Sequence, residues 1–218
     1  MNATAQQTTA PHATGVRVER LAIDRGGWRL FENLSFSAAP GAHVALIGPN
    51  GAGKTSLLRA IAGFLRPSEG SIAVHTITTN AATNAARDGE DPAIRIHFLG
   101  HRDGLKATLD ARAHVRHWAA LLDGDEASDV IARLGLERVA DLPARTLSAG
   151  QGRRLALARL LVAARPVWLL DEPAAALDAS AKALLNSLID THRAGGGVVI
   201  AAVHEPLGAP SQTIELGA

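Results

Sequence analysis

Residues 48–55 read Gly48-Pro49-Asn50-Gly51-Ala52-Gly53-Lys54-Thr55, which matches the pattern G-x-x-x-x-G-K-[ST] at every fixed position. A short apolar run over 44–47 precedes this stretch, and a helical pattern over 56–62 follows it. Such glycines let backbone amides point into one concavity, while Lys54 adds a positive charge and Thr55 offers a hydroxyl to Mg²⁺. The order strand, glycine loop, helix predicts a nucleotide-phosphate site over 48–56, with Ser56 included.

A second stretch supplies acidic groups: Val167-Trp168-Leu169-Leu170-Asp171-Glu172. Four apolar residues predict a buried strand, and its carboxyl end should lie beside the phosphate loop. We expect Asp171 to hold Mg²⁺ there together with Thr55. Glu172 is then free to act as a base that polarises a water molecule for attack on the γ-phosphate.

A third stretch, Leu147-Ser148-Ala149-Gly150-Gln151, is followed by an amphipathic helical pattern. It resembles the L-S-G-G-Q signature of ABC-type ATPases, with Ala149 in place of the first glycine. The order of motifs is also that of the family: phosphate loop, signature, acidic strand, Ala175-Ala176-Leu177-Asp178 and a late His204. Together these motifs cover most of the chain between about residues 16 and 206.

This resemblance implies an α/β fold, a P-loop NTPase of ABC type in which a mixed sheet core carries an antiparallel β subdomain and an inserted helical subdomain. It implies ATP and Mg²⁺ as cofactors. It also implies a homodimer that encloses each ATP between one phosphate loop and the partner's signature, with Ser148, Gly150, Gln151 and Asp178 as nucleotide contacts. His204 follows an apolar run over 198–203, and the family role carried to it is to contact the γ-phosphate and order the attacking water.

The remaining pattern predicts how the chain is organised. Residues 1–14 read as a disordered tail, and 15–218 as a single nucleotide-binding domain whose helical subdomain covers about 100–163. Two strands within 16–36 should be joined by a turn at Asp24-Arg25-Gly26-Gly27, with further strands over 70–74 and 95–99. A polar surface loop is expected over 75–92, and a helical region over 109–136 with a break at 123–124.

Composition narrows the class of function. The chain has 218 residues with 22 basic and 21 acidic side chains, so its charge does not indicate nucleic acid as a partner. It contains no cysteine, which excludes disulfides and thiol chemistry. No apolar run reaches 18 residues, so the chain is not expected to span a membrane by itself.

Two positions depart from the ABC pattern. Most such domains stack an aromatic residue of the first turn on adenine, whereas here Arg25 falls at about that position. A guanidinium can stack on a purine, and Trp28 is the competing candidate, although its indole could equally belong to the core. The second departure is His101, which stands where the family has a glutamine that contacts Mg²⁺ and the membrane partner. His101 is therefore a candidate metal ligand as well as a coupling residue.

The loop Leu99-Gly100-His101-Arg102-Asp103-Gly104-Leu105-Lys106, the signature followed by Arg-Arg, and Arg25 together resemble the ATP-binding subunits of cytochrome c maturation, the haem exporters. The resemblance implies a peripheral protein on the cytoplasmic face of a bacterial inner membrane, bound to a multi-spanning membrane subunit. The alternatives are an ABC ATPase for another substrate and a soluble ABC-type ATPase in macromolecular assembly.

His114 and His117 lie three residues apart with Trp118 beside them, which invites a haem-binding interpretation. Packing or a partner surface is the more frequent explanation of such a helix face, and it is the one we favour.

Overall fold

The computed structural model describes residues 13–77, 96–125, 129–205 and 207–217. Its first sheet is antiparallel, with the strand order β2-β1-β4. These strands are β1 (Ala13–Arg25), β2 (Trp28–Ala38) and β4 (Glu69–Ile77). The β1–β2 connection is a two-residue turn of Gly26 and Gly27, both at positive φ, which is the backbone that tight hairpins need.

The second sheet has five strands in the order β5-β6-β7-β3-β8, and every neighbouring pair is parallel. They are β3 (His43–Ile47), β5 (Ile96–Leu99), β6 (Val167–Asp171), β7 (Val198–Ala202) and β8 (Gln212–Glu215). All residues of β6 and β7 are buried, because helices and the first sheet cover both faces. The strands predicted from the apolar runs are confirmed to within a residue or two.

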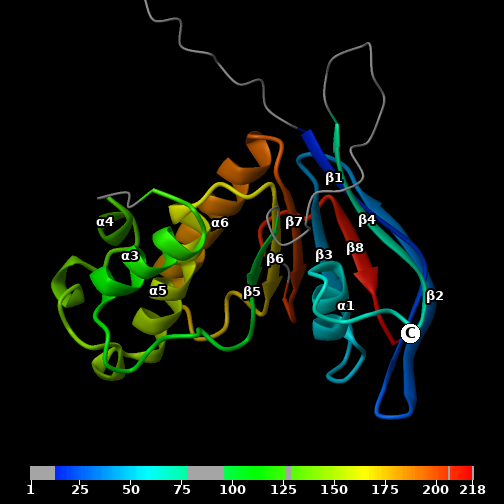
Figure 1. Ribbon diagram of the computed structural model, residues 1–218, viewed down its shortest axis with the longest axis horizontal. Helices are drawn as coiled ribbons and strands as arrows, with labels where there is room; N and C mark the ends of the chain where they lie inside the picture. The colour runs from blue at the N-terminus through cyan, green and yellow to red at the C-terminus, as the bar shows by residue number, and fades with distance from the viewer. Residues whose placement is uncertain (1–12, 78–95, 126–128, 206, 218) are drawn as a thin grey trace, which may run out of the picture.

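Helices flank the parallel sheet on opposite sides, as Figure 1 shows. On one side α1 (Lys54–Ile61) packs with both sheets around Leu21, Leu57 and Ile200. On the other side α6 (Ala179–Ala194) and a helical region share a core that includes Trp118, Leu157 and Leu185. That region comprises α3 (Ala111–Leu121), α4 (Val130–Arg133), two short 3₁₀ turns, η1 (Glu137–Val139) and η2 (Ala144–Thr146), and α5 (Ala149–Val162).

Several boundaries differ from those predicted. Strand β1 begins at Ala13, within the expected 1–14 tail, and the rest of that tail lies outside the described residues. Strand β4 extends to Ile77 because it pairs along β1, so the expected loop begins later than residue 75, and 78–92 are not described. The helical break is confirmed, since α3 ends at Leu121 and Asp123 has a φ of 50°.

Helix α3 settles the question of its two histidines. His114 is buried, its ring lies 5.3 Å from that of Trp118, and its Nε2 accepts a hydrogen bond from the Lys106 amide. His117 is exposed, so the two imidazoles do not share one face. His114 is therefore a packing residue, as favoured above.

Three further histidines lie within the folded core and stay neutral. Burial lowers the pKa of His43, His97 and His192 to about 4 each. His97 Nε2 lies 2.8 Å from the Ala163 carbonyl oxygen, and the His192 ring stacks 3.9 Å from that of Trp168. Neither ring nitrogen of His43 has a hydrogen-bond partner in the described part of the chain.

We expect acid to weaken this fold. Between pH 6.5 and about 4 the unfolded chain binds protons at these histidines while the folded chain does not. The free energy of unfolding should then fall as pH decreases, by about 1.4 kcal/mol per pH unit for each histidine. Urea unfolding of His43→Leu should show a shallower pH dependence than the natural chain, whereas the exposed His117→Leu should not. Equal slopes for His43→Leu and the natural chain would contradict the expectation.

Candidate nucleotide-binding and hydrolysis site

The phosphate loop connects β3 to α1, and two of its glycines are required by their surroundings. Gly48 has a φ of 133°, and a Cβ there would collide with the Leu216 carbonyl just after β8. Gly53 has a φ of 98°, and a Cβ there would approach Phe31 Cε1 to 2.9 Å. The loop is therefore held between the end of β8 and an aromatic ring of β2.

Lys54 is buried within this loop. Its Nζ donates to the carbonyl oxygens of Gly48 at 2.6 Å and Pro49 at 3.0 Å, which leaves one of three ammonium hydrogens for another acceptor. No carboxylate of the described residues lies within ion-pair distance of it. The amino-terminal turn of α1 has no side-chain cap and no acidic residue. A buried cation beside uncapped amides fits an anionic ligand such as a nucleotide phosphate.

A metal-binding pair lies next to the lysine. Thr55 Oγ1 is 3.0 Å from both carboxylate oxygens of Asp171, although 116 residues separate the two in sequence. Burial raises the pKa of Asp171, and the hydrogen bond from Thr55 opposes that rise. A hydroxyl and a carboxylate are oxygen ligands that suit Mg²⁺, which usually keeps several waters and substrate oxygens as its other ligands. The described residues form no cluster of three or more acidic, histidine or cysteine side chains that would hold a metal by themselves.

Glu172 lies between two imidazoles. His204 Nε2 is 3.1 Å from Glu172 Oε1, and His101 Nδ1 is 3.8 Å from Glu172 Oε2. Glu172 itself has a φ of 50°, a left-handed conformation that side chains rarely adopt. The structure therefore brings together the predicted base, the predicted water-positioning histidine and the histidine found in place of glutamine.

The topology explains this convergence. Strands β3, β5, β6 and β7 are parallel, so their carboxyl ends meet at one edge of the sheet. The phosphate loop follows β3, His101 follows β5, Asp171 and Glu172 end β6, and His204 follows β7. Each strand thus delivers one component of the site.

The signature lies away from this edge. Ser148 caps α5 by accepting a hydrogen bond from the Gln151 amide, while Gln151 Oε1 accepts from the Ser148 amide. Gly150 lies against the Ala176 carbonyl, and Asp178 caps α6 by accepting from Ala181. Helices α5 and α1 lie on opposite sides of the parallel sheet in Figure 1. One chain therefore does not bring Ser148, Gly150, Gln151 or Asp178 to its own phosphate loop.

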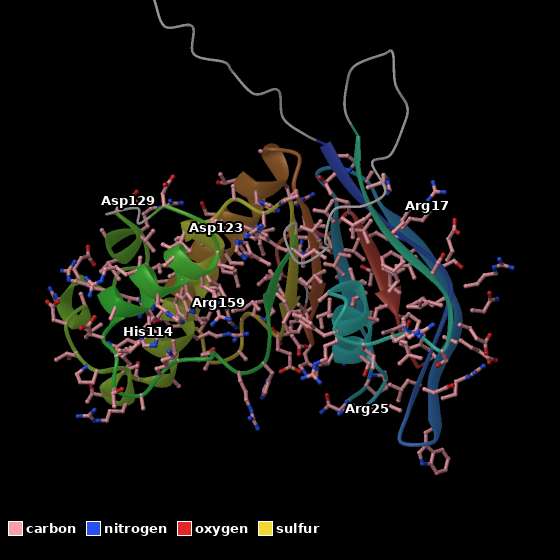
Figure 2. All side chains as sticks on the ribbon, viewed as in Figure 1. Arg17, Arg25, His114, Asp123, Asp129 and Arg159 are labelled. Atoms are coloured by element: carbon pink, nitrogen blue, oxygen red, sulfur yellow. The ribbon has the colours of Figure 1, made fainter. Side chains whose placement is uncertain are left out.

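The hairpin tip holds both adenine candidates. Arg25 pairs with Trp28 across the turn, and Figure 2 places Arg25 at the end of the β1–β2 hairpin. Trp28 is 79% exposed, so the alternative that its indole belongs to the core is wrong. The aromatic ring that does touch the phosphate loop is Phe31, which sequence reasoning missed.

Sequence reasoning also assigned no role to Arg153, the first of the two arginines after the signature. Its side chain is buried, and it contacts both the loop after β5 and the end of β6. The signal available in the sequence was the Arg-Arg pair itself, but only the packing reveals its partners.

Fold and site together define a P-loop ATPase of ABC type. The family model described as "ABC transporter" matches residues 31–175. The chain belongs to this family. Among the residues that the model describes, no helix combines the length and apolar character needed to cross a bilayer.

Similar sequences carry a more specific name. A protein of Nitrobacter winogradskyi named "Cytochrome c biogenesis ATP-binding export protein CcmA" is 45% identical over 88% of this chain and 93% of its own length. A protein of the same name from Rhodopseudomonas palustris is 47% identical, with 89% and 94% covered.

Solved structures support the fold. A putative ABC transporter ATP-binding protein from Pyrococcus furiosus superposes with a TM-score of 0.76 at 23% identity, covering 93% of this chain and 97% of its own. A bacterial Atm1-family ABC exporter with ATP bound gives 0.75 at 22% identity, covering 97% of this chain and 39% of its own. At these identities the likeness concerns the fold alone.

Proposed function

We propose that this chain is the ATP-hydrolysing subunit of a membrane ABC complex for haem export in cytochrome c maturation. The observation that carries the proposal is identity of 45–47% to proteins named for cytochrome c biogenesis, over more than nine-tenths of their lengths. Supporting it are the His101 loop and a site whose residues fit ATP hydrolysis.

The reaction is phosphoryl transfer from ATP to water, and the chain's groups divide the work. Lys54 and the amides of residues 48–56 hold the β- and γ-phosphates, while Thr55 and Asp171 hold Mg²⁺. The metal, when bound, neutralises phosphate charge. Glu172 accepts a proton from the attacking water, and His204, which donates to Glu172 at 3.1 Å, positions that carboxylate.

The active form that we propose is a head-to-tail homodimer. The signature residues lie on the opposite side of the sheet from their own phosphate loop, so a second copy must supply them to each ATP. Ser148 and Gly150, at the amino-terminal end of α5, then offer donors and the positive end of a helix dipole to the γ-phosphate. Arg25 at the hairpin tip stacks on adenine.

The remaining assignments concern organisation and location. Residues 15–218 form a single nucleotide-binding domain with a helical subdomain over about 100–163. A multi-spanning membrane subunit binds it at the cytoplasmic face of the bacterial inner membrane. His101 couples that subunit to the site through its position beside Glu172.

Deleting the gene tests the proposal. Covalent haem attachment to c-type cytochromes should be lost while b-type cytochromes remain, because general haem starvation would remove both pools. A gel stained for haem peroxidase activity, paired with spectra of the membrane fraction, reads both. The control is the deletion strain carrying the gene on a plasmid. Wild-type c-type bands in a deletion strain without a second copy of the gene would refute the cytochrome c assignment and leave the ABC family assignment intact.

A further inference from the structure

Arg153 uses every hydrogen of its guanidinium. A guanidinium carries five N–H donors, and five acceptors surround this one. Nε donates to the Pro173 carbonyl at 3.2 Å. Nη1 donates to the Gly100 carbonyl at 3.1 Å and to Asp103 Oδ1 at 2.8 Å. Nη2 donates to the carbonyls of Asp171 at 3.1 Å and Glu172 at 2.8 Å.

These acceptors belong to two different segments. Three of them are the successive carbonyls of residues 171–173, where β6 ends in the metal-binding and base carboxylates. The other two lie in the loop after β5 that carries His101. Arg153 itself stands in the second turn of α5, the helix whose first residues are the signature. One buried side chain therefore joins the signature helix to both acidic and histidine elements of the hydrolysis site.

The backbone at Glu172 needs such support. A residue other than glycine at a φ of 50° is unfavourable by about 1–2 kcal/mol unless its surroundings hold it. The Glu172 amide donates to the Ala202 carbonyl at 2.9 Å, and its carbonyl accepts from Arg153. These two bonds fix the peptide groups on either side of the Cα that carries the base.

A second arginine of α5 holds the same loop. Arg159 donates to the Asp103 carbonyl and lies over the Trp118 ring, 4.7 Å from its centroid. Figure 2 labels Arg159 within the helical region. The loop after β5 is thus anchored to α5 by two buried guanidinium groups, of which only that of Arg153 also reaches β6.

We propose that Arg153 is a positioning residue for ATP hydrolysis. It holds the backbone of Glu172 and the His101 loop in fixed register with the signature helix, so that the base faces the attacking water. This inference rests on the proposed ATPase activity, and it assigns Arg153 no contact with the nucleotide.

The variant Arg153→Lys separates positioning from charge. Lysine keeps the positive charge but has three donors on one nitrogen, which cannot reach two segments at once. In the full chain we expect kcat for ATP to fall about tenfold or more, with KM and ATP stoichiometry unchanged. Arg112→Lys is the matched control, because Arg112 Nε also bonds a carboxylate at 2.9 Å but on the exposed surface of α3. It should retain natural kcat.

Backbone hydrogen exchange gives a readout that does not depend on turnover. Arg153→Lys should raise exchange in peptides covering 99–104 and 171–177, while the phosphate loop over 48–55 keeps its natural rate. If the natural chain fails to hydrolyse ATP, the proposed function fails, and the exchange pattern still decides the role of Arg153.

Two results would overturn the inference. One is natural kcat and natural exchange in Arg153→Lys. The other is a uniform rise in exchange with kcat falling only in proportion to ATP stoichiometry, which is the behaviour of a purely structural residue. If Arg153→Lys does not fold, Asp103→Asn carries the test. It should lower kcat at unchanged KM and raise exchange over 99–104 alone, and an unchanged kcat would overturn the inference.

Discussion

Glu172→Gln should reduce ATP turnover by about 10²- to 10⁴-fold while ATP binding stays intact. The amide keeps the shape of the side chain and can still accept from His204, but it has no basic oxygen to take a proton from water. The phosphate contacts of Lys54 are made by other atoms, so the affinity for ATP should not change. The homodimer should therefore persist with ATP bound.

Steady-state phosphate release and ATP titration of the same preparation measure both quantities. The control is Glu137→Gln, which makes the same chemical change at an exposed residue of the 3₁₀ turn η1. Turnover of the folded Glu172→Gln variant within a few-fold of the natural chain would remove Glu172 from the role of base.

Lys54→Ala should weaken ATP binding by about ten- to a hundredfold and stop turnover. The ammonium is buried and its two protein acceptors are neutral carbonyls, so a phosphate is its charged partner. One charge-assisted hydrogen bond of this kind is worth about 1.5–3 kcal/mol.

Titration with a fluorescent ATP analogue measures the change, and thermal unfolding shows whether the variant is folded. Lys182→Ala, on the exposed side of α6, should bind ATP as the natural chain does. Unchanged affinity in Lys54→Ala would count against the assignment of residues 48–55 to phosphate binding.

Much of the site could be predicted because its parts are local in sequence. The phosphate loop, the acidic end of β6 and the serine cap of α5 each depend on a few neighbouring residues whose conformations follow from glycine, apolar runs and capping side chains. The rule that parallel strands present their carboxyl ends at one edge then brings Thr55 to Asp171. Position along the chain was enough for these.

Other features failed or stayed open because they depend on contacts between distant segments. The sequence left Trp28 either in the core or at adenine, and the structure exposes its indole, since the two-residue glycine turn carries it beyond the sheet. The sequence placed His114 and His117 on one face, but the direction of the α3 core buries the first and exposes the second.

The sequence by itself determined the class of the protein, because its motifs are short runs in which backbone conformation and chemistry are set by adjacent residues. Only the tertiary structure decided which side chains support those motifs. Arg153 reads as one half of an ordinary Arg-Arg pair, yet packing of α5 against the ends of β5 and β6 surrounds it with five acceptors. Phe31 reads as a residue of an edge strand, yet it lies against Gly53. Such roles arise from burial and approach between segments far apart in the chain, which no local pattern encodes.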